Sequence, residues 1–322
     1  MSEKDTVTKE YMKDKETFAD AFNFYLYDGE QVIKPEQLKE LDTTSVALPY
    51  GENGKPVPIQ KYRDILKFVT AMEDGNAAYL LLGIENQSQI HYAMPVRNML
   101  YDALQYTAQV SETAKAHKRD NDRPETESEF LSGFYKSDKL LPVITLTVYF
   151  GAEKWDAPRS LSEMFKVSDS RLLEYISDYK LNIIVPAEIA DNNFQKFHTE
   201  LNLALKYVKY SKDKDKLIQV VNEGTAYTAV TKKTADMLNI VTNSKLNYDN
   251  GKERVNVCEA IEGIRADGVA EGIIKGKVEG KAEGKFEALA SLVKDGLLSL
   301  TEAAKRLDMT VSEFEEKSGL KA

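Results

Sequence analysis

The sequence predicts an α/β protein, in which helices flank a mixed β-sheet on both faces and an α-helical extension follows at the C-terminal end. Residues 141–150 form a nearly continuous run of β-branched and aromatic side chains, typical of a central strand buried on both faces. Residues 60–88 contain two apolar, β-prone runs around a turn signal. Helical patterns lie between and after these strands, and strands interleaved with helices indicate a sheet covered on both sides.

The N-terminal region predicts one helix and then a loop-rich approach to the sheet. Residues 9–27 show helical periodicity, with Asp20 and Asn23 one turn apart on the flank of the helix. Residues 28–58 contain many Gly and Pro turn signals and little periodicity. The apolar residues of the helix are expected to form one buried stripe: Phe18, Phe22, Tyr25 and Leu26.

Residues 60–88 predict a β-hairpin that brings two acidic residues together. The dipeptide Asp74-Gly75 suits a type I′ turn, and a two-residue loop there sets Asp64 directly opposite Glu85. Opposed carboxylates repel each other at a cost of roughly 0.2–1 kcal/mol, so a cation between them is favoured. Carboxylate oxygens are hard ligands of the kind that Mg²⁺ takes. The alternative is a pair of acids on a solvated hairpin face.

A second helix is expected after the hairpin. Pro95 suits the first helical position, and the pattern continues to about Val110. Arg97, Tyr101 and Gln105 form a stripe at i, i+4 and i+8. In one interpretation they are surface residues whose stems cover the core. In the other, Arg97 contacts a phosphate. The core side of the helix is expected to comprise Leu100, Ala103 and Leu104.

The middle of the chain predicts a charged loop between this helix and two further strands. Residues 111–138 are highly charged, and we expect a helix end and then a mobile loop with a solvated His117. After the strand at 141–150, Trp155 is expected to be a packing anchor. Residues 181–186 predict another short strand.

The C-terminal third predicts helices and contains an internal repeat. In residues 264–285 a glycine recurs every four residues, and on a helix these glycines trace a slowly winding groove. Such a groove suits close approach of a second helix in a homodimer; a flexible charged linker is the alternative. The predicted parts are an α/β domain at 1–210, a helical extension at 211–263, the repeat at 264–285 and a small helical tail with two capping boxes at 286–322.

The composition limits the classes of protein to which the chain can belong. Hydrophobic residues make up 42% and charged residues 30% of the 322 residues, which is ordinary for a globular protein. No apolar run approaches about 18 residues and the N-terminus lacks a signal core, so we expect no membrane span and a cytoplasmic location. The single cysteine, Cys258, excludes an internal disulfide and a thiolate metal cluster. The net charge of −9 is unlike that of a strong non-specific DNA binder, so we expect any DNA affinity to be weak and salt-sensitive unless a partner or an oligomer supplies more contacts.

Short blocks follow one another in a specific order along most of the chain. They are FADAFN at 18–23, YRDIL at 62–66, IENQS at 84–88, MPVR at 94–97, YDA at 101–103, LPVITLTVYFG at 141–151 with Trp155, and the C-terminal Gly-Lys-x-Glu-Gly repeat. In this order they resemble the recombination-promoting nuclease (Rpn)/putative transposase family of the PD-(D/E)XK nuclease superfamily. The resemblance implies a restriction-endonuclease-like fold and a Mg²⁺-dependent DNA endonuclease linked to recombination or transposition.

The resemblance also implies a metal site on the hairpin. Asp64 and Glu85 would hold Mg²⁺, or Mn²⁺ in its place, together with the backbone carbonyl of Asn86. Gln87 stands where the superfamily usually has Lys, and would orient the attacking water. Because Gln carries no positive charge, slow turnover is one expectation, and a charge supplied by Arg97 is another.

The resemblance also implies roles for residues outside the hairpin. Asp20 would approach the metal as a third carboxylate, with a solvated helix acid as the alternative. Arg97 would contact a DNA phosphate, and Asn23 and Tyr101 would support the site. The rival hypothesis is a non-catalytic DNA-binding or assembly protein on a degenerate nuclease fold, which the acidic charge, the missing Lys and the repeat favour. The acids at both metal positions favour the enzyme.

Overall fold

The computed structural model describes residues 3–41, 47–48, 57–58, 69–85, 92–249 and 251–320. For residues 3–5, 47–48, 57–58, 69, 82–85 and 266–271 it describes the backbone alone. The chain divides into two units, which are described separately: unit 1 (Met1–Ala260) and unit 2 (Ile261–Ala322).

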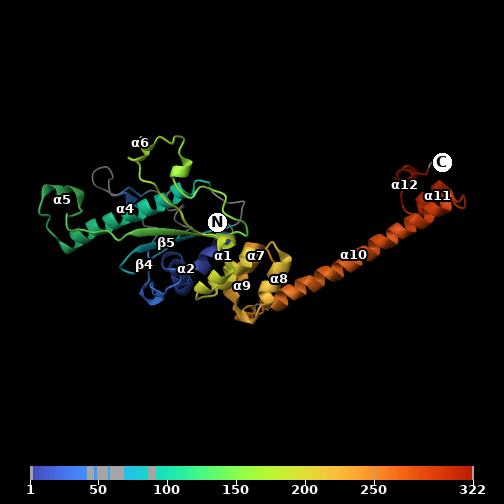
Figure 1. The fold of residues 1–322 in the computed structure, drawn as a ribbon, viewed down its shortest axis with the longest axis horizontal. Helices are drawn as coiled ribbons and strands as arrows, with labels where there is room; N and C mark the ends of the chain where they lie inside the picture. Colours follow the sequence, from blue (N-terminus) through green and yellow to red (C-terminus); the bar gives the residue numbers. More distant parts are fainter. Residues whose placement is uncertain are drawn as a thin grey trace. The chain divides into compact units, whose positions relative to one another are not determined.

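A five-stranded mixed sheet with the order β1-β4-β5-β6-β7 forms the centre of unit 1 (Figure 1). The first three strands in this order pair antiparallel, and β5, β6 and β7 pair parallel. The predicted strands at 141–150 and 181–186 are confirmed, and the last six residues of β6 are buried. The mixed α/β class is also confirmed. The strands are β1 (Lys39–Glu40), β4 (Val69–Glu73), β5 (Ala78–Glu85), β6 (Val143–Phe150) and β7 (Asn182–Ile184).

Helices cover both faces of this sheet. Figure 1 shows α4 (Met94–Asp120) on one side and α2 (Lys15–Tyr27) on the other. Asn98 of α4 donates a hydrogen bond to Thr147 of β6 at 3.0 Å, and Phe22 of α2 packs on Tyr79 of β5 with ring centroids 5.1 Å apart. Thr147 and Tyr79 lie on opposite faces because side chains alternate along a strand. The sheet is therefore the middle layer of unit 1.

The N-terminal region forms two helices instead of the single predicted helix at 9–27. α1 (Glu3–Met12) ends where Asp14 caps the start of α2, and the Asp14 carboxylate accepts a hydrogen bond from the Thr17 backbone at 3.0 Å. Aspartate is a favoured N-cap, so the break has a local cause that the periodicity did not reveal. Phe18 and Phe22 are buried as predicted, whereas Tyr25 is exposed.

The helix after the hairpin is longer than predicted. It begins as expected, with Pro95 in its first turn, but continues past Val110 to Asp120 and ends at Asn121 in the left-handed conformation. Its charged last turns are helical, contrary to the expected loop, because basic residues near a helix C-terminus interact favourably with the helix dipole. Ala103, a predicted core residue, is exposed. The buried face instead comprises Met94, Pro95, Asn98, Tyr101, Leu104 and Ser111.

The hairpin is present, but its predicted register is wrong. Glu73 pairs with Ala78 instead of Asn76, so the loop has four residues and the register is shifted by two. The Asp74 carboxylate accepts hydrogen bonds from two backbone groups inside the loop, those of Asn76 and Ala77, which favours the longer turn. Gly75 has the expected positive φ of 86°. The described ladder ends at the pair Val69–Leu82; the predicted partner of Glu85, Asp64, lies outside the described residues.

Short elements complete unit 1. After η5 (Pro186–Glu188) the chain forms a 3₁₀ helix at Asp191–Lys196, and the side chains of Phe194 and Phe197 are buried. The remaining elements are η1 (Pro35–Gln37), β2 (Ala47–Leu48), β3 (Val57–Pro58), α5 (Glu127–Ser132), η4 (Ser162–Met164), α6 (Ser170–Leu173), η5 (Pro186–Glu188), η6 (Asp191–Lys196), α7 (Leu201–Tyr210), α8 (Lys214–Asn222), η7 (Ala226–Ala229), β8 (Val230–Thr231), α9 (Lys232–Thr242) and β9 (Arg254–Val255).

Unit 2 contains most of α10 (Val257–Lys294), together with α11 (Leu300–Arg306) and α12 (Val311–Ser318). The glycine repeat is helical, so the linker alternative is not what the structure shows. Each glycine costs about 1 kcal/mol relative to alanine in a helix. The predicted capping box at Thr310 is complete, whereas Ser299 caps α11 through its own side chain alone. The small core consists of Leu289, Ala303, Ala304 and Phe314.

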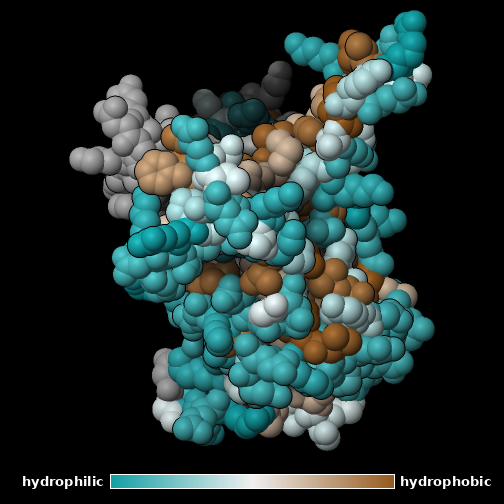
Figure 2. Space-filling model, turned by 90° about the vertical axis from the view of Figure 1, so that its left-hand side faces the viewer, coloured by the Kyte–Doolittle hydropathy of each residue, from teal (hydrophilic) through white to brown (hydrophobic). Residues whose placement is uncertain are grey.

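The surface is mainly polar. Figure 2 shows a face that is largely hydrophilic, with hydrophobic side chains gathered in separate patches. Phe130 and Leu131 of α5 and Tyr175 after α6 are among the exposed large hydrophobic residues. Within the described ranges, no helix combines the length and the hydropathy needed to cross a membrane.

Candidate active site

Three parallel strands end side by side, and their ends define the carboxyl edge of the sheet: Glu85 in β5, Phe150 in β6 and Ile184 in β7. Glu85 pairs with Phe150, so the last residues of the two longest strands are neighbours. In open α/β sheets, ligands bind beyond the carboxyl ends of the parallel strands. The backbone of Glu85, a predicted metal ligand, therefore occupies the edge where a site is expected.

The helix α4 brings its N-terminal turns to the same edge. It runs antiparallel to β6: Asn98 contacts Thr147, Asp102 contacts Thr145 and, further along, the Tyr106 hydroxyl accepts a hydrogen bond from the Val143 backbone. Thr147 is three residues from the end of β6. Residues just before Asn98, including the predicted phosphate contact at position 97, therefore lie near the carboxyl edge.

Arg97 is held in place by Tyr101. The Arg97 Nε donates a hydrogen bond of 2.6 Å to the Tyr101 hydroxyl, and the guanidinium lies 5.7 Å from the centre of the tyrosine ring. Tyr101 is fully buried, whereas Arg97 is half-buried. Burial raises the pKa of Tyr101, and the nearby guanidinium opposes that rise. Tyr101 thus serves as a rigid, neutral acceptor that orients the Arg97 side chain.

Buried polar atoms without partners gather between α4 and the end of β6. The Tyr149 hydroxyl, the Trp155 indole nitrogen and Asn98 Oδ1 are buried and have no hydrogen-bond partner among the described residues. Unsatisfied buried polar groups are rare in native proteins and often mark functional regions. Trp155 packs edge-on against Tyr149, 5.4 Å between ring centroids, which confirms its role as a packing anchor. A side chain at Gly151 would overlap with the Tyr149 ring.

The metal residues predicted on the hairpin lie outside the described residues or are described only in part. Asp64, Asn86 and Gln87 lie outside the described residues, and Glu85 is described by its backbone alone. Within the described part of the chain, no group of three His, Cys, Asp or Glu side chains could hold a metal ion. The donor types expected at the hairpin, two carboxylates and a backbone carbonyl, fit a hard cation such as Mg²⁺.

Comparison with known families decides the identity of the chain. Residues 2–238 match the family model described as "Putative transposase, YhgA-like". The chain belongs to this family. The resemblance to the Rpn/putative transposase family is thereby confirmed. Comparisons with curated proteins and with solved structures found no match.

The other two residues that the family resemblance singled out are occupied in structural contacts. Asp20 is buried, and its carboxylate accepts hydrogen bonds from the backbones of His198 and Thr199 and from the Thr199 hydroxyl, the last at 2.6 Å. Asn23 is also buried and bonds the backbone of Ile33 through both its oxygen and its nitrogen. In this arrangement Asp20 fixes the turn before α7.

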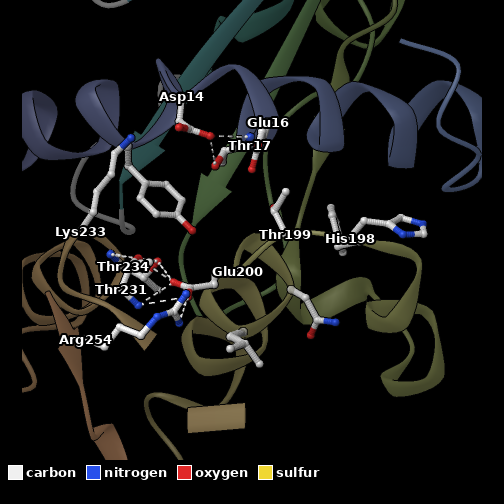
Figure 3. Close-up of a pocket in the computed structure, with 14 residues that line it drawn as sticks. Asp14, Glu16, Thr17, His198, Thr199, Glu200, Thr231, Lys233, Thr234 and Arg254 are labelled. Carbon is white, nitrogen blue, oxygen red and sulfur yellow. Dashed lines mark hydrogen bonds and ion pairs between the residues drawn. The ribbon is translucent and has the colours of Figure 1, made fainter. Parts of the chain in front are cut away.

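A cavity of about 570 Å³ lies elsewhere in unit 1, and none of the predicted site residues lines it (Figure 3). Its walls come from α1, α2, the turn before α7, α9 and β9. Glu200 crosses the lower part of the view and bonds Thr231 and Thr234 at the start of α9, while Arg254 approaches the same carboxylate. Thr231 caps α9 by accepting a hydrogen bond from the Thr234 backbone, and the Glu200 carboxylate holds both threonine side chains, so it is already engaged in structural hydrogen bonds.

Sequence reasoning missed a half-buried carboxylate, that of Asp102, and misjudged the environment of a histidine. Asp102 accepts hydrogen bonds from Thr145 and from the Tyr179 hydroxyl at 2.7 Å; burial raises its pKa, and the two bonds oppose this. Asp102 lies in the matched block YDA, which was the available signal. His117, expected to be solvated, is instead half-buried.

His117 joins the end of α4 to the segment that follows. Its ring bonds Asp138 at 2.9 Å on one side and Asp122 at 3.1 Å on the other, and it stacks on Tyr135 with a centroid distance of 3.7 Å. The bond to Asp138, followed by that to Asp122, raises the pKa of His117 above its usual 6.5. The ring, when protonated, holds residues 121–141 against α4 through its bonds to Asp122 and Asp138.

We expect this contact to weaken as pH rises. Because the pKa of His117 is higher in the folded state, the stabilisation is complete below about 6.5 and is lost as pH rises through the raised value. An NMR titration should give His117 a pKa above 6.5, and hydrogen exchange in residues 121–141 should accelerate, beyond its intrinsic pH dependence, above that pKa. Asp138→Asn should lower the pKa. A wild-type value at or below 6.5 would contradict this account.

Proposed function

We propose that the chain is a metal-dependent DNA endonuclease with a restriction-endonuclease-like core in unit 1. The observation that carries the proposal is the meeting of Glu85 and the N-terminal turns of α4 at the carboxyl edge. The matched family model, whose description names a transposase, supports a role in DNA recombination or transposition. DNA is the proposed substrate and partner.

Asp64, Glu85 and the backbone carbonyl of Asn86 would hold Mg²⁺. When bound, Mg²⁺ polarises a phosphate oxygen and lowers the pKa of a bound water. Gln87 would orient the attacking water through its amide. Because Gln87 is neutral, the positive charge that the superfamily pattern places at this position must come from elsewhere.

Arg97 is the proposed source of that charge. Its guanidinium is charged at all relevant pH values and is suited to phosphate oxygens. The bond to Tyr101 fixes its direction, so less side-chain freedom is lost when it meets DNA. We assign Arg97 to a phosphate contact and Tyr101 to positioning of Arg97. Asp20 and Asn23 are assigned to the structural contacts described above, and a third carboxylate is not needed for the proposed chemistry.

A metal titration tests this proposal without relying on turnover. Isothermal titration with Mg²⁺ or Mn²⁺ should detect binding to the wild-type chain and a loss of it in Asp64→Ala. Glu73→Gln, at the opposite end of the same hairpin, is the matched control and should bind as wild type. Equal metal binding by Asp64→Ala and wild type would reject the metal assignment and favour the rival hypothesis of a non-catalytic DNA-binding or assembly protein.

Replacing Arg97 by Gln should reduce cleavage by roughly 10–100-fold while leaving metal affinity unchanged. The variant should lose one charge-assisted phosphate contact. The slope of log DNA affinity against log salt concentration should therefore become less steep by about one. Arg97→Lys should restore part of the activity, because it keeps the charge but loses the fork geometry. Arg119→Gln, an exposed arginine near the other end of α4, is the control. Wild-type cleavage by Arg97→Gln would remove Arg97 from the site.

A further inference from the structure

The middle of α10 is a helix that none of the described residues covers. Every residue from 272 to 285 is exposed, although the stretch contains Ile273, Ile274 and Val278, which are 53%, 64% and 64% exposed. It also contains four glycines, each of which weakens a helix relative to alanine. An isolated helix with this composition lacks the packing that normally stabilises helices in proteins. The segment therefore gains little helical stability from packing against the described part of the chain.

Two stripes run along opposite sides of this segment. The glycine stripe consists of Gly272, Gly276, Gly280 and Gly284, and a Cβ added at any of them would meet nothing within 4 Å. The aliphatic ridge consists of Ile274, Val278 and Ala282. At about 100° per residue, the ridge lies about 200° around the helix from the glycine stripe. The glycines leave room for another helix to approach, but they carry almost no apolar surface. The ridge carries the apolar surface that association would bury.

The ridge continues a face that is already packed. Four residues after Ala282, Phe286 lies against Phe314 of α12 with ring centroids 5.2 Å apart, and Ala290 joins the same small core. In Figure 1, α11 and α12 fold back against the C-terminal end of α10, so they cover this face only near its end. The preceding turns of the same ridge, at Ile274 and Val278, remain uncovered.

The charges on the two sides of the ridge favour a second copy of this chain as the binding partner. Lys277 and Lys281 form a basic edge on one side. On the other side Glu279 and Glu283 form an acidic edge, and Lys275 at the start of that edge lies 3.9 Å from the Glu279 carboxylate. In a parallel two-fold pair, the basic edge of one helix faces the acidic edge of the other. In an antiparallel pair, like edges would face each other. The near balance of both signs also disfavours DNA as the occupant of this surface.

We infer that two copies of the chain associate in parallel through the aliphatic ridge of α10. Because the ridge recurs every four residues and drifts by about 40° per step, the two helices wrap around each other with a right-handed twist. The glycine stripe, where the sequence suggested a dimer contact, faces outward in this arrangement. The interface is short, so we expect a dimer that dissociates in the micromolar range. The inference does not depend on nuclease activity.

Sedimentation of the full chain across micromolar concentrations tests the contact. As the concentration rises, the apparent mass of the wild type should increase from one to two monomer masses. The apparent mass of Ile274→Ser/Val278→Ser should stay at one monomer mass. Gly276→Ala/Gly280→Ala fills the glycine stripe and should dimerise at least as well as the wild type. A wild type that is monomeric throughout would overturn the inference, and so would loss of the dimer in the alanine variant alone. Circular dichroism confirms that each variant is folded.

Orientation is tested by charge reversal and cross-linking. Lys277→Glu/Lys281→Glu and Glu279→Lys/Glu283→Lys should each dimerise more weakly and should form a mixed dimer when combined. In a Cys258→Ser background, Ile274→Cys and Ala282→Cys should each form a disulfide with the same position of the second copy. An antiparallel pair allows at most one of these two disulfides, so failure of either would overturn the parallel arrangement.

Discussion

Replacing Glu85 by Gln is expected to reduce DNA cleavage by roughly a thousandfold. A bound metal contributes several kcal/mol of charge stabilisation in the transition state, and each 1.4 kcal/mol corresponds to about tenfold in rate. Gln keeps the shape of the side chain but removes the negative charge that would hold the ion. Supercoiled-plasmid cleavage at saturating Mg²⁺ measures the effect.

The position of Glu85 makes this test specific. It is the last residue of β5, so its replacement leaves the buried part of the strand unchanged. Glu73→Gln changes the same residue type in the same hairpin, at the last residue of β4 beside the loop, and should cleave as wild type. If Glu85→Gln and Glu73→Gln both retain full activity, the hairpin end is not the catalytic site.

Replacing Asp20 by Ala should destabilise unit 1 by about 3–5 kcal/mol. The substitution leaves the backbone donors of His198 and Thr199 and the Thr199 hydroxyl without their acceptor. Each unsatisfied buried donor costs about 1–3 kcal/mol, and partial access of water lowers the total. Chemical unfolding gives the free energy. Glu16→Gln, an exposed acid on the same helix, should change it by less than about 1 kcal/mol.

The same variant separates two roles for Asp20. If the carboxylate is structural, Asp20→Ala lowers stability but leaves Mn²⁺ affinity intact at temperatures where the protein is folded. If it is a third metal ligand, as the family resemblance implies, Mn²⁺ affinity falls as well. Thr199→Val provides a milder check, since it removes one donor and keeps the carboxylate; it should cost about 1 kcal/mol. We expect the structural outcome.

Features governed by local composition were predictable from the sequence. The apolar run at β6 identified a buried strand, the run at β7 identified a second, short strand, and Pro95 marked the start of α4. The order of short blocks identified the family, which residue patterns alone could not do. Trp155 was correctly expected to pack, because an aromatic residue after a buried strand usually anchors the loop that follows.

Features that depend on contacts distant in sequence were not predictable. The partners of Asp20 lie about 180 residues away, so no helical pattern could show that the carboxylate fixes the turn before α7. The hairpin register was missed for a local reason instead: the Asp74 carboxylate accepts hydrogen bonds from the loop backbone, which favours four loop residues over two. His117 looked solvated because its neighbours are charged, but Asp138, 21 residues later, returns to it.

Supercoiled-plasmid nicking with Mg²⁺, Mn²⁺ or EDTA, by the wild type and by Asp64→Ala, tests the central claim most directly. We predict nicking by the wild type with either metal, none with EDTA, and a loss of nicking in Asp64→Ala although the variant remains folded. Absence of nicking by the wild type at low salt and high protein concentration would contradict the endonuclease account, as would cleavage that persists in EDTA or in Asp64→Ala.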